Sequence, residues 1–253
     1  MSMEEAATLS CGSFAAFVSL FHESGANMPF TFAFSSSPTL TQQALIQENL
    51  AIIKEEYGPS IFVLGGSSSV GQYTIQFARL AGFSTIITTA SSTHNDHLMS
   101  LGASHVLSRD TPPDDIAALA LGSMGNGVLW VPSSKATPLV VDCIATKVTQ
   151  NYGVAVLNAW SPSFGGTLIS MSTARPDNVP DVVDVRGIFA LTFALKDISL
   201  HFFRLMSRFL DTQEVVPNRC EIVGGLEAAE AAMNRLEGQT VSGVKLVLKV
   251  SPN

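Results

Sequence analysis

The sequence has few charged residues and few cysteines, and each shortage excludes a class of protein. Charged residues make up 14% of the 253 residues and the net charge is −7, so no basic stripe exists to neutralise the phosphates of nucleic acid. The three cysteines, Cys11, Cys143 and Cys220, are scattered along the chain. This pattern predicts reduced thiols, and neither a disulfide framework nor a zinc site.

Targeting signals are equally scarce. No apolar run has the length of a membrane span. Glu4 and Glu5 stand where a secretory signal would have its basic region. We therefore expect a cytoplasmic protein that binds neither nucleic acid nor a membrane.

Recognisable catalytic motifs are also missing. The sequence has no nucleophile elbow with a Ser/His/Asp order, no HExxH or CxxC motif, and no closely spaced pair of acids in suggestive surroundings. Tyr57, Tyr73 and Tyr152 are the only tyrosines, and none lies in a recognisable proton-donor motif. We therefore assign no catalytic residue and expect no bound metal.

The strongest positive signal lies in residues 61–82. Residues 61–64 form a short apolar run that is typical of a parallel strand covered on both faces. A glycine-serine turn follows, and from Val70 the apolar residues recur at helical spacing. Because the free N–H groups at the start of such a helix attract phosphate, the turn predicts a nucleotide site. Its candidate residues are Gly66, Ser67, Ser68, Ser69 and Val70.

The glycine fingerprint of this turn is imperfect. Aligned on Gly66 and Gly71, it has Ser68 where the dinucleotide fingerprint has its second glycine. A β-branched run over residues 84–90 follows as a second strand and completes a βαβ unit. The alternative is a serine-rich turn that binds no nucleotide.

The loop after this second strand indicates which nucleotide is bound. It carries Ser92, Thr93, His94 and Asn95, with no acid before Asp96 to bond a ribose 2′-hydroxyl. These donors suit a 2′-phosphate, so NADP is favoured over NAD. In the alternative interpretation, Ser92 or Thr93 caps the following helix.

The loop itself has no lysine or arginine, and Arg109 is the nearest fixed positive charge that could meet the 2′-phosphate. Arg109 follows the third predicted strand, where it would meet the 2′-phosphate. Alternatively, it is an exposed residue paired with Asp110.

Alternating helices and strands along the rest of the chain predict an α/β fold with a Rossmann-type, doubly wound parallel sheet. We expect helices at residues 4–9, 14–21, 41–57, 70–81, 93–101, 113–121, 146–160, 196–210 and 226–236, and further strands at 105–108, 138–144, 165–172 and 244–250. Residues 10–13 separate the first two helices. Residues 24–39 form a loop, in which Phe30, Phe32 and Phe34 alternate as in a short strand and either pack inward or line an acyl pocket. His22 is expected to lie on the surface.

Ligands of such sheets bind beyond the carboxyl ends of the strands, at the point where the strand order reverses. Two groups of residues follow from this rule. Ser170 and Met171 end the fifth strand, and Gly187, Ile188, Phe189 and Ala190 follow the next irregular segment.

Four segments together resemble the medium-chain dehydrogenase/reductase superfamily: GGSSSVGQYTIQFARLAGF, TTASSTHN, LGASHVLSRD and SGVKLVLKV. They are most similar to its zinc-independent fungal branch, the trans-acting enoyl reductases that partner polyketide synthases. The resemblance implies a Rossmann domain, bound NADP(H), and hydride delivery to the activated double bond of an enoyl substrate in secondary metabolism. It also makes a small or carrier-bound acyl substrate, a polyketide synthase and a second copy of the chain the candidate partners.

The resemblance assigns roles to particular residues. It places Arg109 beside the adenine, Ser170 and Met171 beside the nicotinamide, and residues 187–190 beside the acyl substrate. Ser242 and Gly243 match a loop that reaches back toward the cofactor. Asp142, at the end of the fourth strand, is expected to be structural.

Members of this family begin with a GroES-like catalytic domain, and residues 4–9 resemble a segment that follows it. We therefore expect residues 1–39 to be a remnant of that domain, residues 40–212 to form the NADP-binding domain, and residues 213–253 to resemble the return to the catalytic domain. The final strand then pairs within the chain, with a second subunit, or with nothing. The alternatives to a reductase are a non-redox isomerase or cyclase, and an accessory subunit.

Overall fold

A computed structural model describes residues 1–33, 37–122, 132, 135–238 and 240–250. Its helices are Met3–Ala6 (α1), Ser10–Phe21 (α2), Leu40–Tyr57 (α3), Ser69–Leu80 (α4), Asn95–Leu101 (α5), Pro113–Leu121 (α6), Lys147–Trp160 (α7), Lys196–Asp211 (α8) and Ala229–Glu237 (α9). Its strands are Ser60–Leu64 (β1), Thr85–Thr89 (β2), His105–Leu107 (β3), Leu139–Asp142 (β4), Gly166–Ser170 (β5), Val183–Gly187 (β6), Cys220–Gly224 (β7) and Lys245–Leu248 (β8). Short 3₁₀ turns cover Ser92–His94 (η1) and Leu226–Ala228 (η2).

Within the described residues, six parallel strands form the main sheet, in the order β3-β2-β1-β4-β5-β6. The order reverses between β1 and β4, which lie side by side with Leu64 opposite Asp142. The strands β1, β2, β4 and β5 are buried along their whole length, because helices cover both faces. This strand order is that of a Rossmann domain, so the predicted fold class is confirmed.

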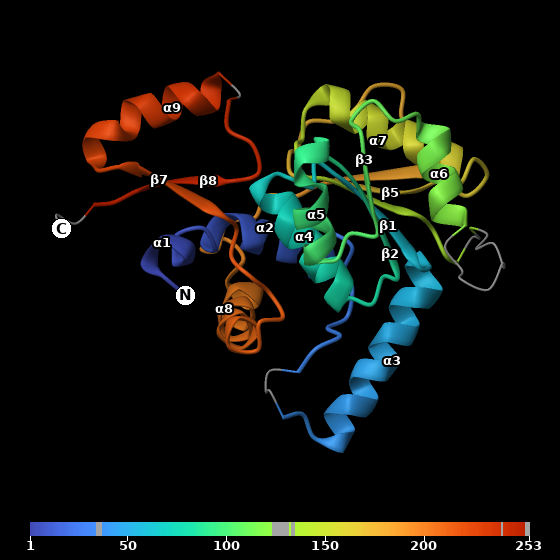
Figure 1. Cartoon of the computed structure of the whole chain (residues 1–253). Coiled ribbons are helices and arrows are strands. Elements are labelled where there is room, and N and C mark those ends of the chain that lie inside the picture. Colours follow the sequence, from blue (N-terminus) through green and yellow to red (C-terminus); the bar gives the residue numbers. More distant parts are fainter. Residues whose placement is uncertain (34–36, 123–131, 133–134, 239, 251–253) are drawn as a thin grey trace.

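The two faces of the sheet have separate apolar layers. On one face α2 packs along α4, with α8 beside them, and on the other α6 packs against α7 (Figure 1). The first layer is rich in phenylalanine, and the Phe17 ring contacts those of Phe21, Phe77 and Phe202. These contacts attach the N-terminal helix α2 directly to the helix that follows the glycine turn.

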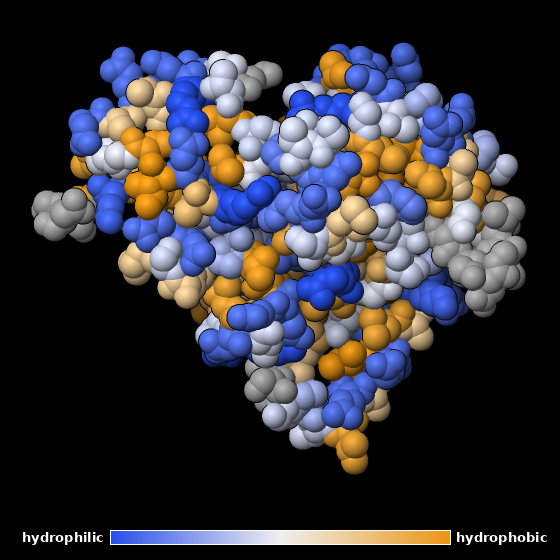
Figure 2. All heavy atoms as spheres, in the orientation of Figure 1, coloured by the Kyte–Doolittle hydropathy of each residue, from blue (hydrophilic) through white to orange (hydrophobic). Residues whose placement is uncertain are grey.

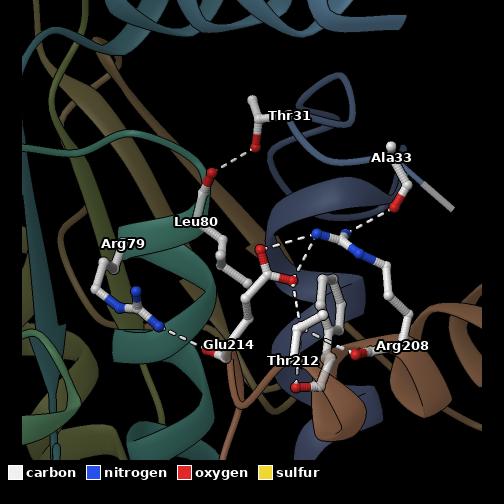
Figure 3. Close-up of polar contacts among 8 residues, drawn as sticks. Thr31, Ala33, Arg79, Leu80, Arg208, Thr212 and Glu214 are labelled. Carbon is white, nitrogen blue, oxygen red and sulfur yellow. Dashed lines mark hydrogen bonds and ion pairs between the residues drawn. The ribbon is translucent and has the colours of Figure 1, made fainter. Parts of the chain in front are cut away.

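A polar cluster ties the end of α8 to two other segments (Figure 3). The half-buried Arg208 guanidinium donates to the carbonyl of Ala33 at 2.7 Å and lies 2.6 Å from the carboxylate of Glu214. Arg79, near the end of α4, donates to the backbone carbonyl of Glu214. The loop after α8 is therefore held against both α4 and the 31–33 loop.

The C-terminal strands form a second, smaller sheet. β7 and β8 pair in parallel, with Cys220 opposite Lys245, and η2 and α9 cross between them. The final strand therefore pairs within the chain. We call residues 220–248 the C-terminal unit. Four of its large apolar side chains are exposed, and Figure 2 shows apolar surface over this part of the molecule: Ile222, Leu226, Met233 and Leu236.

Several expectations for secondary structure were wrong. Residues 10–13 do not separate two helices, because α2 begins at Ser10 and the hydroxyl of Ser13 donates to the Leu9 carbonyl inside the helix. Strand β6 was missed, since its pattern includes Asp184 and Arg186, which stay partly or fully exposed.

In the loop between α2 and α3, the described residues do not form the short strand that the alternating phenylalanines suggested. Residues 30–33 form no strand, and Phe34 lies outside the described residues. Phe32 is buried, and its ring contacts those of Phe30 and Phe209. Phe30 and Phe32 therefore pack inward, as part of the phenylalanine-rich apolar layer.

Among the described residues, no helix combines the length and apolarity needed to cross a membrane. The boundaries at residues 39/40 and 212/213 remain a prediction.

Candidate functional site

The glycines in the turn between β1 and α4 let neighbouring groups approach its backbone closely. Gly65 has φ +77°, a conformation that glycine adopts without strain. A Cβ on Gly66 would overlap the Thr88 side chain, and a Cβ on Gly71 would overlap the backbone of Gly65 and Gly66. The amide of Gly66 donates to the carbonyl of Thr89 at 3.1 Å, which joins the turn to the end of β2.

Ser68 explains the imperfect fingerprint. It is the N-cap of α4, and its hydroxyl accepts a hydrogen bond from the Gly71 amide at 3.0 Å. A glycine at this position would leave that amide free. Ser69 and Val70 open the helix, and Ser67 is buried, with its carbonyl accepting from Gln72 at 3.0 Å. The predicted phosphate residues therefore lie together at the N-terminus of α4.

The loop after β2 meets the C-terminal unit. His94 Nε2 lies 2.8 Å from the hydroxyl of Ser242. Gly243 has φ +70°, and a Cβ there would overlap the imidazole ring of His94. Gln72, in the first turn of α4, approaches the Gly243 carbonyl at 3.5 Å. The structure thus brings His94, Ser242 and Gly243, which lie far apart in sequence, to the start of α4.

The capping interpretation of this loop is wrong. Neither η1 nor α5 has a side-chain cap, and the Thr93 hydroxyl donates instead to Ser91. Ser92 and Thr93 are exposed and Asn95 is half-buried. The hydroxyls at 92 and 93 are therefore accessible to a ligand.

Two arginines add positive charge beside this loop. The pKa of His94 lies below its usual value because the ring is buried and because the Arg219 and Arg109 charges act on it. His97 Nε2 is bonded to Gln72 Oε1, and its pKa is lowered by burial and by Arg219. In the described part of the chain, Arg109 forms no ion pair with Asp110 or with another carboxylate.

Arg219 was missed by sequence reasoning. It follows α8 by several residues and belongs to no motif, so its place beside His94 depends on how the C-terminal unit folds back. Only the structure shows it.

The end of β4, next to the glycine turn, carries a structural acid. The Asp142 carboxylate accepts from the amides of Ile144 and Ala145 at 3.0 Å and from the Thr149 hydroxyl at 2.8 Å. Burial raises its pKa. These bonds hold the turn between β4 and α7 and join it to the first turn of the helix, whose N-cap is Thr146, as expected for a structural acid.

The ends of β5 and β6 bring together the other two predicted groups. Gly187 lies opposite Ser170, and the Ile188 amide donates to the Ser170 carbonyl at 2.9 Å. Ser170 and Ile188 are buried, Met171 and Ala190 are half-buried, and the Phe189 side chain is 67% exposed. Gln150 of α7 donates to the Ser170 hydroxyl at 2.8 Å. Of the six predicted residues at this edge, Met171, Gly187, Phe189 and Ala190 therefore present atoms to a ligand.

The three tyrosines are engaged elsewhere. Tyr57 donates to the Ala26 carbonyl and Tyr152 to the Thr111 carbonyl. The Tyr73 hydroxyl accepts from the Asn218 amide at 3.1 Å. Burial raises the pKa of Tyr152 to about 12. We therefore assign no tyrosine as a proton donor.

His22 is buried, contrary to the surface position that we expected. Its Nδ1 accepts from the Ser24 amide at 3.2 Å, and its Nε2 lies 3.7 Å from Asp197. An open cavity of about 330 Å³ adjoins it, and Glu23 and His201 are among the lining residues. Among the described residues, no group of three His, Cys, Asp or Glu side chains is placed to hold a metal ion.

Comparison with known proteins shows which proteins this chain resembles. A dehydrogenase of Aspergillus niger, azaJ, is 31% identical over 195 residues, which cover 76% of this chain and 53% of the relative. The trans-enoyl reductase ACTTS2 of Alternaria alternata is 26% identical over 261 residues, covering 94% of this chain and 71% of the relative. The chain is therefore similar in sequence to fungal dehydrogenases and trans-enoyl reductases. The resemblance drawn from the four sequence segments is therefore confirmed.

Solved structures of other proteins share the fold. The CurK enoyl reductase superposes with a TM-score of 0.62 at 17% identity, over 99% of this chain and 64% of that protein. No protein-family model matches the chain. The chain spans about half the length of the first curated relatives that it matches, 53% for azaJ.

Proposed function

We propose that this chain binds NADPH and acts as an NADPH-dependent reductase of an α,β-unsaturated (enoyl) acyl substrate in fungal polyketide metabolism. The observation that carries the proposal is the glycine turn at the point where the strand order reverses. Side chains at Gly66 and Gly71 would overlap neighbouring atoms, so the turn keeps its backbone open to a pyrophosphate.

The residues around the turn fit a dinucleotide. The start of α4 offers backbone N–H groups and a favourable dipole to the pyrophosphate. Ser92, Thr93 and Asn95 offer donors to the adenosine end, and Arg109 offers positive charge. The ends of β5 and β6, with Met171 and Phe189, would flank the nicotinamide and the acyl chain.

The chemistry would come mainly from the cofactor, since NADPH supplies the hydride when it is bound. The chain's own part is to hold the dinucleotide and to align the substrate with it, and such alignment accounts for a large share of rate enhancement. The lack of an assigned proton donor is compatible with this division. The relatives named trans-enoyl reductase support the substrate class, and we propose a polyketide synthase or a second copy of the chain as a partner.

The test is turnover of 2-enoyl thioesters by the purified chain with NADPH. We expect consumption of NADPH together with a product two hydrogens heavier than the substrate. Gly122→Ala, at the C-terminal end of α6, is a glycine control, and it should consume NADPH at the rate of the unsubstituted chain. An isomer of equal mass formed without NADPH would replace the proposal with the isomerase or cyclase alternative. NADPH binding without turnover of any thioester would favour an accessory subunit.

A further inference from the structure

The segment before β7 runs along α4 toward the glycine turn. The Val216 amide donates to Gln76 Oε1 at 2.8 Å, and the Asn218 amide donates to the Tyr73 hydroxyl at 3.1 Å. Asn218 Nδ2 then donates to the Ser69 hydroxyl at 2.7 Å. The three contacts advance by one helical turn at a time to the first residue of α4.

Arg219 is the next residue of this segment, and its backbone position is fixed. Asn218 before it is only 3% exposed. The carbonyl of Arg219 accepts from the Lys245 amide at 2.9 Å. Lys245 follows closely after the loop in which Ser242 and Gly243 contact His94. The backbone of Arg219 therefore lies between the start of α4 and the strand that carries this loop.

The charge of Arg219 is not neutralised within the described residues. It is exposed, and no carboxylate forms an ion pair with it or with Arg109 among the ion pairs of the described chain. Arg235 of the C-terminal unit, by contrast, forms a bidentate pair with Glu221 at 2.7 and 2.9 Å. Unpaired positive charges beside a phosphate-binding turn, in a chain of net charge −7, indicate an anionic ligand.

We propose that Arg219 completes the 2′-phosphate site with Arg109 and the donors of residues 92–95, and that it determines the preference for NADPH over NADH. This inference rests on the proposed function. An arginine binds a phosphate dianion through charge-assisted, often bidentate hydrogen bonds. NADH has a neutral hydroxyl in place of this phosphate and gains nothing from the charge.

The assignment gives the C-terminal unit a role in cofactor choice. The surface is indented between this unit and the Rossmann domain (Figure 2), and the start of α4 lies on the side of the domain that faces the unit (Figure 1). Arg109 follows β3 of the Rossmann domain, and Arg219 immediately precedes β7 of the C-terminal unit. A bound 2′-phosphate would bridge the two.

The experiment is calorimetric titration of the full chain, and of its variants, with NADPH and with NADH. Arg219→Gln should weaken NADPH binding by roughly 10- to 100-fold, the loss expected for one charged hydrogen-bond partner, and should leave NADH binding unchanged. The NADPH affinity of Arg219→Lys should lie between those of the unsubstituted chain and of Arg219→Gln, since lysine keeps the charge but not the bidentate geometry. Arg204→Gln, an exposed arginine of α8, is the matched control and should leave both affinities unchanged.

The outcomes separate this inference from the proposed function. If Arg219→Gln keeps the full NADPH preference of the unsubstituted chain, the role of Arg219 is overturned and the NADPH proposal stays intact. An equal loss of affinity for NADH would show a general role in binding and would also overturn the assignment. An unsubstituted chain that binds neither nucleotide would overturn both. Thermal unfolding of each variant checks that it is folded.

Discussion

At the residue scale, Gly71 controls how closely α4 approaches the glycine turn. A Cβ at this position would overlap the Gly65 carbonyl, and backbone atoms have little freedom to move away. We expect Gly71→Ala to lower the free energy of unfolding by about 1–3 kcal/mol, the usual cost of overpacking, and to weaken NADPH binding. Urea unfolding and titration with NADPH measure the two effects, and Gly122→Ala is the control. Unchanged affinity in Gly71→Ala would contradict the assigned role of the turn.

Substitutions of Ser68 distinguish an effect on stability from an effect on NADPH binding. Its hydroxyl caps α4, so Ser68→Ala should lower the free energy of unfolding by about 1 kcal/mol, whereas Ser68→Gly should cost only a few tenths of a kcal/mol. Ser68→Gly also restores the full glycine fingerprint and should bind NADPH at least as tightly as the natural chain. Denaturant unfolding and calorimetry distinguish these expectations. No loss of stability in Ser68→Ala would show that the cap contributes nothing.

His94 makes stability depend on pH. Its pKa in the folded chain lies below the ordinary 6.5, first because of burial and then because of Arg219 and Arg109. As the pH falls from 6.5 through the folded-state pKa, the unfolded chain takes up the proton first, and the free energy of unfolding decreases. Between pH 7.5 and 5.5, about one unit either side of the ordinary pKa, the free energy of unfolding should decrease less in His94→Gln than in the unsubstituted chain. Urea unfolding at the two pH values measures this. An identical decrease in both proteins would refute this account of His94.

At the scale of elements, the end of α8 depends on Arg208. This arginine joins Glu214 and the Ala33 carbonyl (Figure 3). Arg208→Met should lower the free energy of unfolding by about 2 kcal/mol, because hydrogen bonds to charged groups are lost and Glu214 keeps fewer partners. Arg204→Met, on the same helix but exposed, should change it by less than about 0.5 kcal/mol. Chemical denaturation of the two variants makes the comparison, and equal losses would show that the cluster in Figure 3 does not stabilise the fold.

The elements that sequence predicts well are those with strong local patterns. The glycine turn, α4 and β2 were predicted because apolar periodicity and turn residues act within a few positions. Strand β6 was missed because it is an edge strand whose Asp184 and Arg186 hide the apolar alternation.

The site was harder to predict than the fold, for a related reason. The grouping of Gly66 to Val70 could be predicted because these residues share one turn. The contact of His94 with Ser242 was expected only through family resemblance, and the place of Arg219 had no local signal. Both depend on tertiary contacts between segments well over 100 residues apart, as the His94–Ser242 separation of 148 positions shows.

At the scale of the whole molecule, the C-terminal unit should be less stable than the Rossmann domain. It has two strands, one short helix and several exposed apolar side chains, and a two-stranded sheet is marginal by itself. Hydrogen exchange should therefore be faster in β7 and β8 than in β1 and β4. Added NADPH should slow exchange around Arg219 and Ser242, and uniform protection with or without nucleotide would contradict the idea that the cofactor joins the two parts.

The central claim is that the glycine turn and its neighbours bind NADPH, and direct calorimetric titration of the purified chain tests it first. We predict binding in the micromolar range, about −8 kcal/mol, with NADH much weaker. Absence of heat from either nucleotide, in a chain shown to be folded, would contradict the account and would mean that this Rossmann fold no longer binds its cofactor.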